Sequence, residues 1–275
     1  MASLANISTV GVIAGNGLVA SRKIERGALI VQEDALVYYN TSINHTQFTV
    51  VTATNFFQLE RNGVRNRLQT AVEALQDDDQ TKFDNLFTPN SLATPAQQIV
   101  DRFQHNSFHF SGKKSGARPN GHPQTHIVVY PTICMANHSC VPNAMLLIDS
   151  RVSHGDIVRA QGRLVASNTI PAGGEIFLDY MTEGQWLRTH TTRKAELNLG
   201  WNFVCTCSGC EPHIQAQMDE GKRISLSRMH PIFANMASGA AAAQERDTVI
   251  DNLRVYIATL DTLGIWDYRL SYAYV

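Results

Sequence analysis

The chain has 275 residues, of which 44% are hydrophobic and 17% charged, as is usual for a packed globular protein rather than a disordered one. Its formal net charge is −1 and its pI about 6.8, which argues against direct binding of nucleic acid, because chains with that function are usually strongly basic. A neutral total still leaves room for a local acidic groove that binds a basic protein tail.

The amino terminus and the apolar runs predict the compartment. The first residues lack a charged segment followed by a long apolar core, so no secretory signal is expected. The longest apolar runs, such as 127–130 and 144–148, are too short to span a bilayer. We therefore expect an intracellular protein, in the cytoplasm, the nucleus or both, with no membrane association and with reduced cysteines.

Short strand-like runs open the chain. They lie at residues 17–20, 28–32 and 35–39 and are punctuated by glycines, a pattern typical of a compact β meander.

From about residue 44 to residue 110 the apolar period becomes helical. Val64, Leu68, Val72 and Leu75 are spaced by four, four and three residues and share one helix face, and the acidic run at 77–79 ends this pattern. Thr94-Pro95 predicts a second helix start, with threonine as the N-cap. The whole stretch is interpreted as a helical insertion.

After a loop rich in Gly, Lys and Pro at 111–124, strand-like runs resume and a helical tail follows. An apolar stripe in that tail ends at Leu263, and Gly264 stands where a C-terminal cap belongs. The expected strands are 126–130, 144–148, 157–160, 163–167 and 175–180.

The cysteines form the strongest local signal. Cys205, Cys207 and Cys210 lie within six residues, and in a reducing compartment such a cluster indicates a metal site rather than disulfides. Three thiolates occupy three corners of a tetrahedral Zn²⁺, and Cys140 is the best candidate for the fourth. Four sulfur ligands leave no open position, so one structural zinc is expected. Cys134 lies on a strand-like apolar run and is interpreted as a buried small hydrophobe.

Four motifs, in order, resemble those of the SET-domain lysine methyltransferases, and together they span about residues 11–210. Any one alone is a weak signal, but the ordered set is a strong one. The motifs are Gly15-Asn-Gly17-Leu18-Val-Ala20 with Ile24-Glu-Arg-Gly27, then Asn137-His138-Ser139-Cys140-Val-Pro142-Asn143, then Pro171-Ala-Gly-Gly-Glu175-Ile176-Phe-Leu-Asp-Tyr180, and the terminal Cys205-Thr-Cys207-Ser-Gly-Cys210.

The insertion, the Asn106-Ser-Phe108 stretch and the helical tail further resemble the SMYD-type branch and its fungal relatives. The MYND zinc finger of that branch is absent, since no cysteine precedes Cys134, so its partner recognition is not expected here. Gly174 also stands where the family often has an acidic residue.

The resemblance implies a mainly β fold with α-helices (α+β). We expect a SET-domain fold of short strands with a pseudoknot, in which the tail passes through a loop. The helical insertion at about 44–110 and the post-SET zinc motif belong to a domain of residues 1–211, and residues 212–275 form a C-terminal helical segment.

The resemblance also implies a function, transfer of a methyl group from S-adenosylmethionine to an amine, most directly a lysine of a histone or another protein. Tyr180 is the implied catalytic residue and also a cofactor contact, with its hydroxyl near the reacting methyl group and amine. The other implied cofactor contacts are Gly15, Asn16, Gly17 and Leu18 at the charged end, Asn137 and His138 at the polar groups, and Trp201 and Phe203 on the adenine ring.

Several alternatives stay open. Trp201 and Phe203 are equally well interpreted as core aromatics, and His138 can act through its backbone alone. The chain can instead methylate a small-molecule amine or catalyse another S-adenosylmethionine-dependent reaction. A third hypothesis is a binding module without turnover, against which the retained Asn137, His138, Tyr180 and cysteines argue. We expect a monomer without direct nucleic-acid binding, while the substrate and the number of methyl groups transferred remain open.

Overall fold

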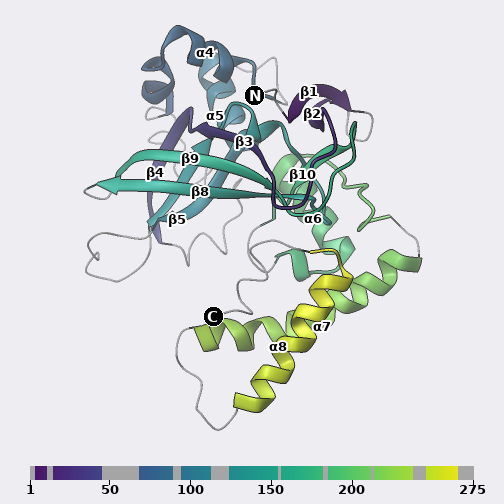
Figure 1. Ribbon diagram of the computed structural model, residues 1–275. Coiled ribbons are helices and arrows are strands. Elements are labelled where there is room, and N and C mark those ends of the chain that lie inside the picture. The colour runs from purple at the N-terminus through teal and green to yellow at the C-terminus, as the bar shows by residue number, and fades with distance from the viewer. Residues whose placement is uncertain are drawn as a thin grey trace. The chain divides into compact units, whose positions relative to one another are not determined.

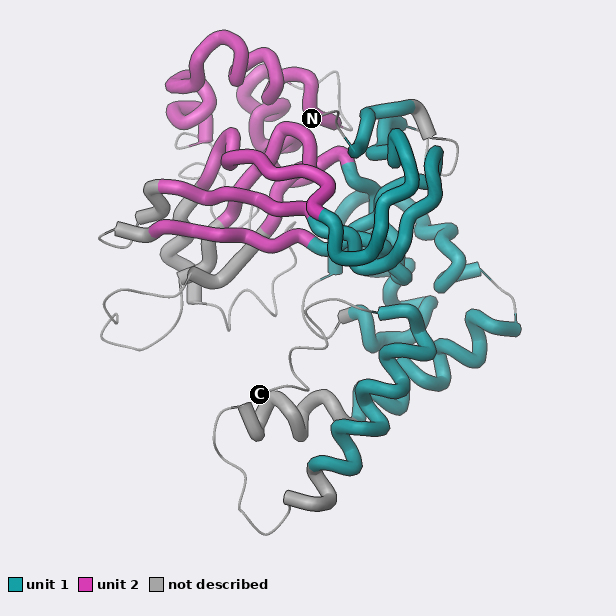
Figure 2. Tube along the Cα trace, viewed as in Figure 1, with its two compact units in different colours: residues 1–28, 136–145, 165–275 teal, residues 29–135, 146–164 magenta. Residues whose placement is uncertain are grey.

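The computed structural model describes residues 4–10, 15–44, 68–88, 94–112, 124–153, 156–181, 185–211, 214–237 and 246–265. The chain divides into two compact units (Figure 2), unit 1 with residues 1–28, 136–145 and 165–275, and unit 2 with residues 29–135 and 146–164. The predicted boundary at 211/212 stays a prediction. No helix in the described ranges is long and apolar enough to cross a membrane.

Unit 1 holds a four-stranded sheet in the order β1-β2-β10-β7 (Figure 1). Strand β2 pairs antiparallel with both β1 and β10, whereas β10 pairs parallel with β7. The sheet therefore joins the first three sequence motifs, which are far apart in the chain. The strands are β1 (Ala5–Val10), β2 (Gly15–Ala20), β7 (Asn137–His138) and β10 (Glu175–Leu178).

The helices of unit 1 follow β10 and have clear end signals. Helix α6 begins after Thr189, whose side chain accepts a hydrogen bond from the backbone N–H of Thr192. After α8, Gly264 has a φ of 67° and the N–H of Ile265 donates to Leu260, so the predicted glycine cap is confirmed as a Schellman-type ending. The elements are η2 (Gln185–Leu187), α6 (His190–Trp201), α7 (Ile214–Ala237) and α8 (Arg246–Thr262).

One apolar core joins these helices to the cysteine motif. Tyr256 and Leu260 of α8 and Leu226 of α7 are fully buried, so the predicted stripe of α8 does face a core, and Tyr256 extends it. Ile250, at the start of the predicted stripe, is exposed. The buried members are Cys140, Met181, Trp186, Leu187, Leu197, Cys205, Cys210, Leu226, Tyr256, Leu260, Leu263 and Ile265.

Unit 2 contains two three-stranded sheets in the orders β3-β9-β8 and β4-β6-β5. In the second sheet both β4 and β5 pair antiparallel with β6. The strands are β3 (Leu29–Asp34), β4 (Val37–Asn44), β5 (Ser107–Gly112), β6 (Gln124–Val129), β8 (Ala144–Ser153) and β9 (Asp156–Ala166).

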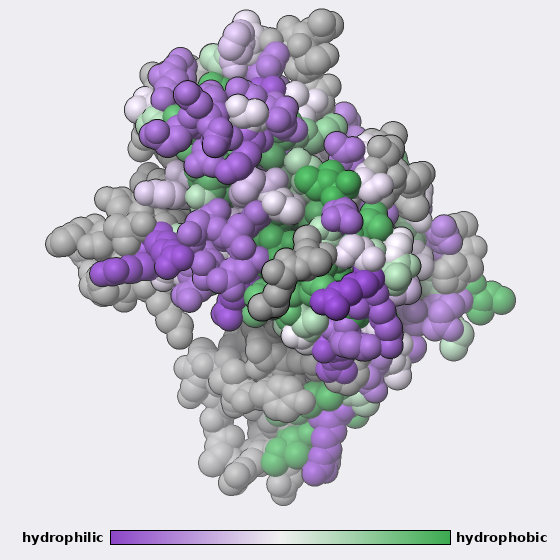
Figure 3. Space-filling view, turned by 45° about the horizontal axis from the view of Figure 1, so that its top comes forward, coloured by the Kyte–Doolittle hydropathy of each residue, from purple (hydrophilic) through white to green (hydrophobic). Residues whose placement is uncertain are grey.

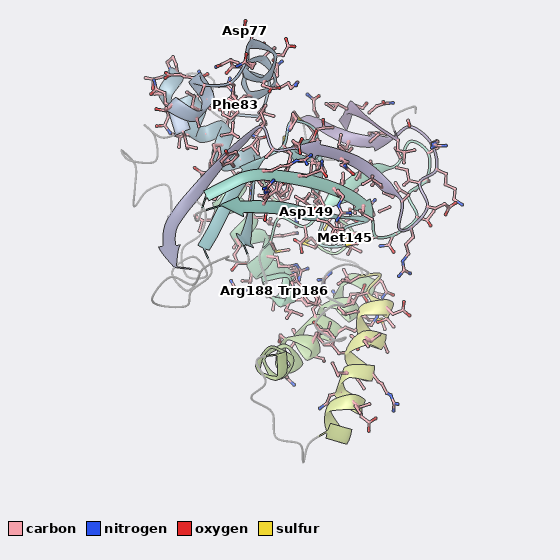
Figure 4. The ribbon with its side chains drawn as sticks, turned by 60° about the vertical axis from the view of Figure 1, so that its left-hand side comes forward. Asp77, Phe83, Met145, Asp149, Trp186 and Arg188 are labelled. Carbon is pink, nitrogen blue, oxygen red and sulfur yellow. The ribbon has the colours of Figure 1, made fainter. Side chains whose placement is uncertain are left out.

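Two helices of unit 2 lie in the described part of the predicted helical insertion, whose last residues, 107–110, belong to strand β5 instead of a helix. Helix α5 (Pro95–Asn106) starts as predicted, with the Thr94 side chain accepting from the Gln97 N–H at 3.3 Å. Helix α4 (Asp77–Asp84) buries Phe83, and Figure 4 shows Phe83 and Asp77 on different sides of it. The outer faces of these helices are mostly hydrophilic (Figure 3), as amphipathic helices require.

Three local expectations need correction. The acidic run at 77–79 does not only end a helix, because it forms the first turn of α4, where carboxylates interact favourably with the helix dipole. The two strands expected at 157–160 and 163–167 are one strand, β9. Cys134 is buried, as expected, but in a 3-10 turn, η1 (Ile133–Met135), rather than a strand. Val64 lies outside the described residues.

Candidate active site and metal centre

The four cysteines predicted to bind zinc lie together in unit 1. Their sulfur atoms are all within 4.8 Å of one another, and the Sγ atoms of Cys140 and Cys210 are 3.5 Å apart, too far for a disulfide. Zn–S bonds of about 2.3 Å in a tetrahedron place the sulfurs about 3.8 Å apart. The described sulfurs thus lie close enough together to surround one metal ion.

The backbone around the cluster explains how distant segments meet. The N–H of Cys210 donates to the carbonyl of Cys207 at 2.8 Å, closing a tight turn. At Gly209 a Cβ atom would lie 2.9 Å from Cγ2 of Val141 and 3.4 Å from Cβ of Cys140. Glycine is therefore needed for the close approach of this turn to the segment that carries Cys140.

The four thiols strongly change one another's pKa values. Hydrogen bonds from the other thiols lower the pKa of Cys207 far below its usual range, and those from Cys140 and Cys205 lower the pKa of Cys210 to about 7. The same contacts raise the pKa of Cys140. Four thiolates this close repel one another, so all four ionise together only around a cation.

Tyr180 follows β10 and packs among the other aromatic residues predicted for the site. Its ring centroid is 5.6 Å from that of Trp201, 6.4 Å from that of Phe203 and 5.4 Å from that of His138. Its hydroxyl donates to the carbonyl of Ala136 at 2.8 Å. The hydroxyl proton is thus occupied, and the ring is held half-buried at a fixed orientation.

Trp201 and Phe203 reach this cluster because of the residue between them. Asn202 ends α6 in the left-handed conformation, with a φ of 57°, and its N–H donates to the carbonyl of Asn198. Asparagine tolerates this conformation better than most residues. Both rings are half-buried and pack against the unit 1 core, so part of each surface is available to a ligand.

The ring of His138 joins the tyrosine to the cysteines. It is 2% exposed, its Nδ1 accepts from the backbone N–H of Tyr180 at 3.1 Å, and its Nε2 lies 3.4 Å from the sulfur of Cys140. These contacts assign the neutral tautomer with the proton on Nε2, which donates to sulfur. The sequence did not predict this contact of the His138 ring with both Tyr180 and Cys140.

Asn137 is oriented by groups from two neighbouring strands. Its amide Nδ2 donates to the Glu175 carboxylate at 2.8 Å and, more weakly, to the carbonyl of Asn16 at 3.4 Å. This fixes which end of the amide is the donor. The acceptor Oδ1 forms no hydrogen bond within the described part of the chain and can accept one from a ligand.

The glycine motif forms a strand rather than a loop. Gly15, Asn16, Gly17 and Leu18 belong to β2, and the side chain of Leu18 is completely buried. Leu18 is also paired with Ile7 and Ile176 in the sheet, so it offers no exposed surface to a ligand in this conformation. Asn16 is exposed and is the member whose side chain can reach a ligand.

Two further residues hold the site and were not singled out from the sequence. The side-chain amide of Asn143 donates to the carbonyl of Glu175 at 2.9 Å and accepts from the N–H of Phe177 at 2.8 Å. It thus forms with the backbone of β10 the pair of hydrogen bonds that a neighbouring strand would form. Arg193 of α6 contacts the cysteine cluster. Asn143 could have been found, since it closes its motif, but no sequence signal marks Arg193.

A family model described as SET domain matches residues 15–181, which include β2, the segment of Cys140 and Tyr180. A curated relative from Drosophila melanogaster, SET domain-containing protein SmydA-8 isoform B, is 26% identical over 117 residues, covering 42% of this chain and 24% of its own length. The chain thus spans about a quarter of that relative.

Two solved structures are also similar. One, the SET domain of LSMT bound to lysine and AdoHcy, is 14% identical with a TM-score of 0.35 and covers 74% of this chain and 53% of its own. The other, the same domain bound to MeLysine and AdoHcy, is 13% identical with a TM-score of 0.37 and covers 77% and 53%.

Proposed function

Because this chain belongs to the SET-domain family, we propose that it transfers a methyl group from S-adenosylmethionine to an amine, and that the amine is a protein lysine. The observation that carries the proposal is the fixed Tyr180 hydroxyl, held by Ala136 within a cluster of His138, Trp201 and Phe203. A half-buried, oriented tyrosine at the end of the family's last matched motif suits a positioning task rather than packing alone.

The proposed reaction breaks a sulfur–carbon bond and forms a nitrogen–carbon bond in line with it. The bound cofactor supplies the activated methyl group on its sulfonium. The protein must present a neutral amine, and a lysine in water has a pKa of about 10.4. Half-buried aromatic rings around Tyr180 exclude water, and desolvation favours the neutral amine.

Tyr180 contributes through its oxygen lone pairs. Because its hydroxyl proton is donated to the carbonyl of Ala136, the oxygen is oriented as an acceptor toward other groups. An acceptor at this position aligns the N–H groups of an incoming amine and directs its nitrogen lone pair toward the methyl carbon. Tyr180 thereby positions the nucleophile.

The same geometry supports the cofactor contacts that we propose. The Oδ1 of Asn137 would accept from the ammonium group at the charged end, beside the exposed Asn16. The half-buried Trp201 and Phe203 would stack on the adenine, and backbone groups of β2 and of His138 would supply the remaining polar contacts. Each group is already oriented by protein hydrogen bonds or packing, so binding costs little reorganisation.

We also propose one structural zinc at Cys140, Cys205, Cys207 and Cys210. Four sulfurs that lie within 4.8 Å of one another support this assignment. With all four positions taken by protein, the metal has no part in methyl transfer. Its task is to hold the Trp201–Phe203 segment against the segment that carries His138.

The test uses tritium-labelled S-adenosylmethionine, once with an array of lysine peptides and once with a metabolite extract. The proposal predicts label in peptides that contain lysine and none when that lysine is replaced by arginine. Tyr180→Phe removes the label, while Tyr38→Phe, at an exposed tyrosine of unit 2, retains it. Label in metabolites alone supports the small-molecule alternative, and absence of label in both contradicts the methyltransferase.

A further inference from the structure

Arg193 is a buried cation beside the cysteine cluster. It is completely inaccessible to solvent, and its guanidinium donates from Nε to the sulfur of Cys140 at 3.3 Å and points Nη2 at the sulfur of Cys210 at 3.9 Å. Its other donors reach the carbonyls of Gly209, at 2.9 Å, and Arg188. Within the described residues, no carboxylate forms an ion pair with it.

A buried guanidinium without a negative partner is strongly unfavourable, because it loses its hydration. Neutral thiols cannot balance the charge. The side chain is therefore placed correctly only if the cysteines beside it are thiolates.

The charge balance of a metal site explains the arrangement. Four thiolates around a divalent cation leave two negative charges in a core that also contains Trp186, Leu197 and Leu226. One buried arginine cancels one of these charges. The N–H···S contacts also spread charge away from the sulfur atoms, which stabilises the thiolate form at the metal.

We propose that Arg193 is the resident counter-charge of the cysteine cluster, a positioning residue whose N–H groups, directed at the sulfurs of Cys140 and Cys210, set the affinity for zinc. The inference rests on the proposed zinc site and adds a determinant that is not a ligand. It predicts that α6 contributes to metal binding although it carries no ligand.

The matched variants are Arg193→Met, Arg193→Lys and Lys194→Met. Arg193→Met keeps the length and apolar packing but removes the charge. Arg193→Lys keeps the charge on a compact ammonium group instead of a planar guanidinium. Lys194→Met removes a charge from the neighbouring position of α6. Zinc affinity is measured on the full chain by competition with a coloured chelator. A second readout is the sulfur-to-metal charge-transfer band of the Co²⁺-substituted protein, which responds to hydrogen bonds at sulfur.

Outer-shell substitutions at metal sites cost about 10- to 100-fold in affinity, and this loss is expected for Arg193→Met. Arg193→Lys is expected to recover part of the zinc affinity but to shift the charge-transfer band. Lys194→Met is expected to match the wild type in both zinc affinity and the position of the band.

If Arg193→Met does not fold, the charge-transfer band of Arg193→Lys decides, since an unshifted band with wild-type affinity overturns the inference. Wild-type affinity in folded Arg193→Met, or equal loss in Lys194→Met, also overturns it. A wild-type protein without zinc refutes the metal site itself, and that result is distinguishable from the others.

Discussion

At the scale of single residues, the site depends on side chains whose hydrogen bonds leave one atom to act. Tyr180 gives its proton to Ala136 and Asn137 gives its N–H groups to Glu175 and Asn16, so each keeps an acceptor oxygen. His138 differs, because both of its ring nitrogens are used within the protein. Each retained acceptor is therefore oriented before any ligand arrives.

The substitution Tyr180→Phe tests the role of the tyrosine oxygen. The ring can keep its packing against Trp201 and Phe203, so cofactor affinity should stay near that of the wild type. Loss of amine alignment should lower kcat by about 100-fold. Calorimetry with S-adenosylmethionine and single-turnover methyl transfer separate the two quantities, and an equal loss in both contradicts the positioning role.

Glu175→Ala tests whether the carboxylate orients Asn137. Loss of a hydrogen bond to a charged group costs about 1.5–3 kcal/mol, and a freely rotating amide should weaken S-adenosylmethionine binding by about tenfold. Glu25→Ala, at an exposed glutamate that pairs with Lys23, is the control. Unchanged cofactor binding in Glu175→Ala would show that Asn137 is held by other groups.

Much of the site was predictable at this scale, because its chemistry lies in rare residues at short spacing. Cysteines separated by one and two residues predict a cluster of thiols that could hold a metal, and Cys140 stood out within its motif. Arg193 was not predictable, since an arginine in an amphipathic helix usually faces solvent. Only the three-dimensional contact with two sulfurs distinguishes it from the neighbouring Lys194.

At the scale of elements, end signals were easier to predict than strand continuity. Thr94 begins α5 and Gly264 ends α8 through contacts within one helical turn, so the local sequence determines these helix ends. The continuity of β9 depends instead on packing across unit 2. Gly162 lies between the two strands expected at 157–160 and 163–167, and a Cβ there would lie 2.8 Å from both Ile133 and Tyr130, so the glycine serves close packing within a continuous strand.

Gly162→Ala should therefore destabilise the protein. The added methyl group meets buried side chains that cannot move freely, and overpacking of this kind costs about 1–3 kcal/mol. Gly221→Ala is the opposite control, because nothing lies near its Cβ position on the exposed face of α7 and alanine should stabilise the helix by about 1 kcal/mol. Urea unfolding measures both, and a neutral Gly162→Ala would contradict the close contact.

At the scale of the whole molecule, the cysteine cluster connects the segments that make unit 1. Cys140, the 205–210 turn and helices α7 and α8 share one core. Arg223 of α7 donates to the carbonyls of Cys140 and Trp186 at 2.7 and 3.0 Å, and Figure 4 shows Trp186 and Arg188 at the entry to this helical part. The SET-domain fold was predictable from ordered motifs. The threading of the tail through a loop stays a prediction.

Cys207→Ser tests the connection between the metal and the cofactor. Loss of one thiolate should abolish stoichiometric zinc and free the segment of Trp201 and Phe203, so S-adenosylmethionine binding should weaken together with thermal stability. Thr206→Ala, at the exposed position between two cysteines, should change neither. A Cys207→Ser protein that keeps zinc and cofactor affinity would refute this connection.

Native mass spectrometry of the purified chain, with and without S-adenosylmethionine, tests the central claim most directly. The proposed methyltransferase should carry one zinc in both spectra and gain the mass of one S-adenosylmethionine when it is added. A chain without zinc, or one that holds zinc and never binds S-adenosylmethionine, contradicts the proposal that a zinc-thiolate cluster supports a methyl-transfer site.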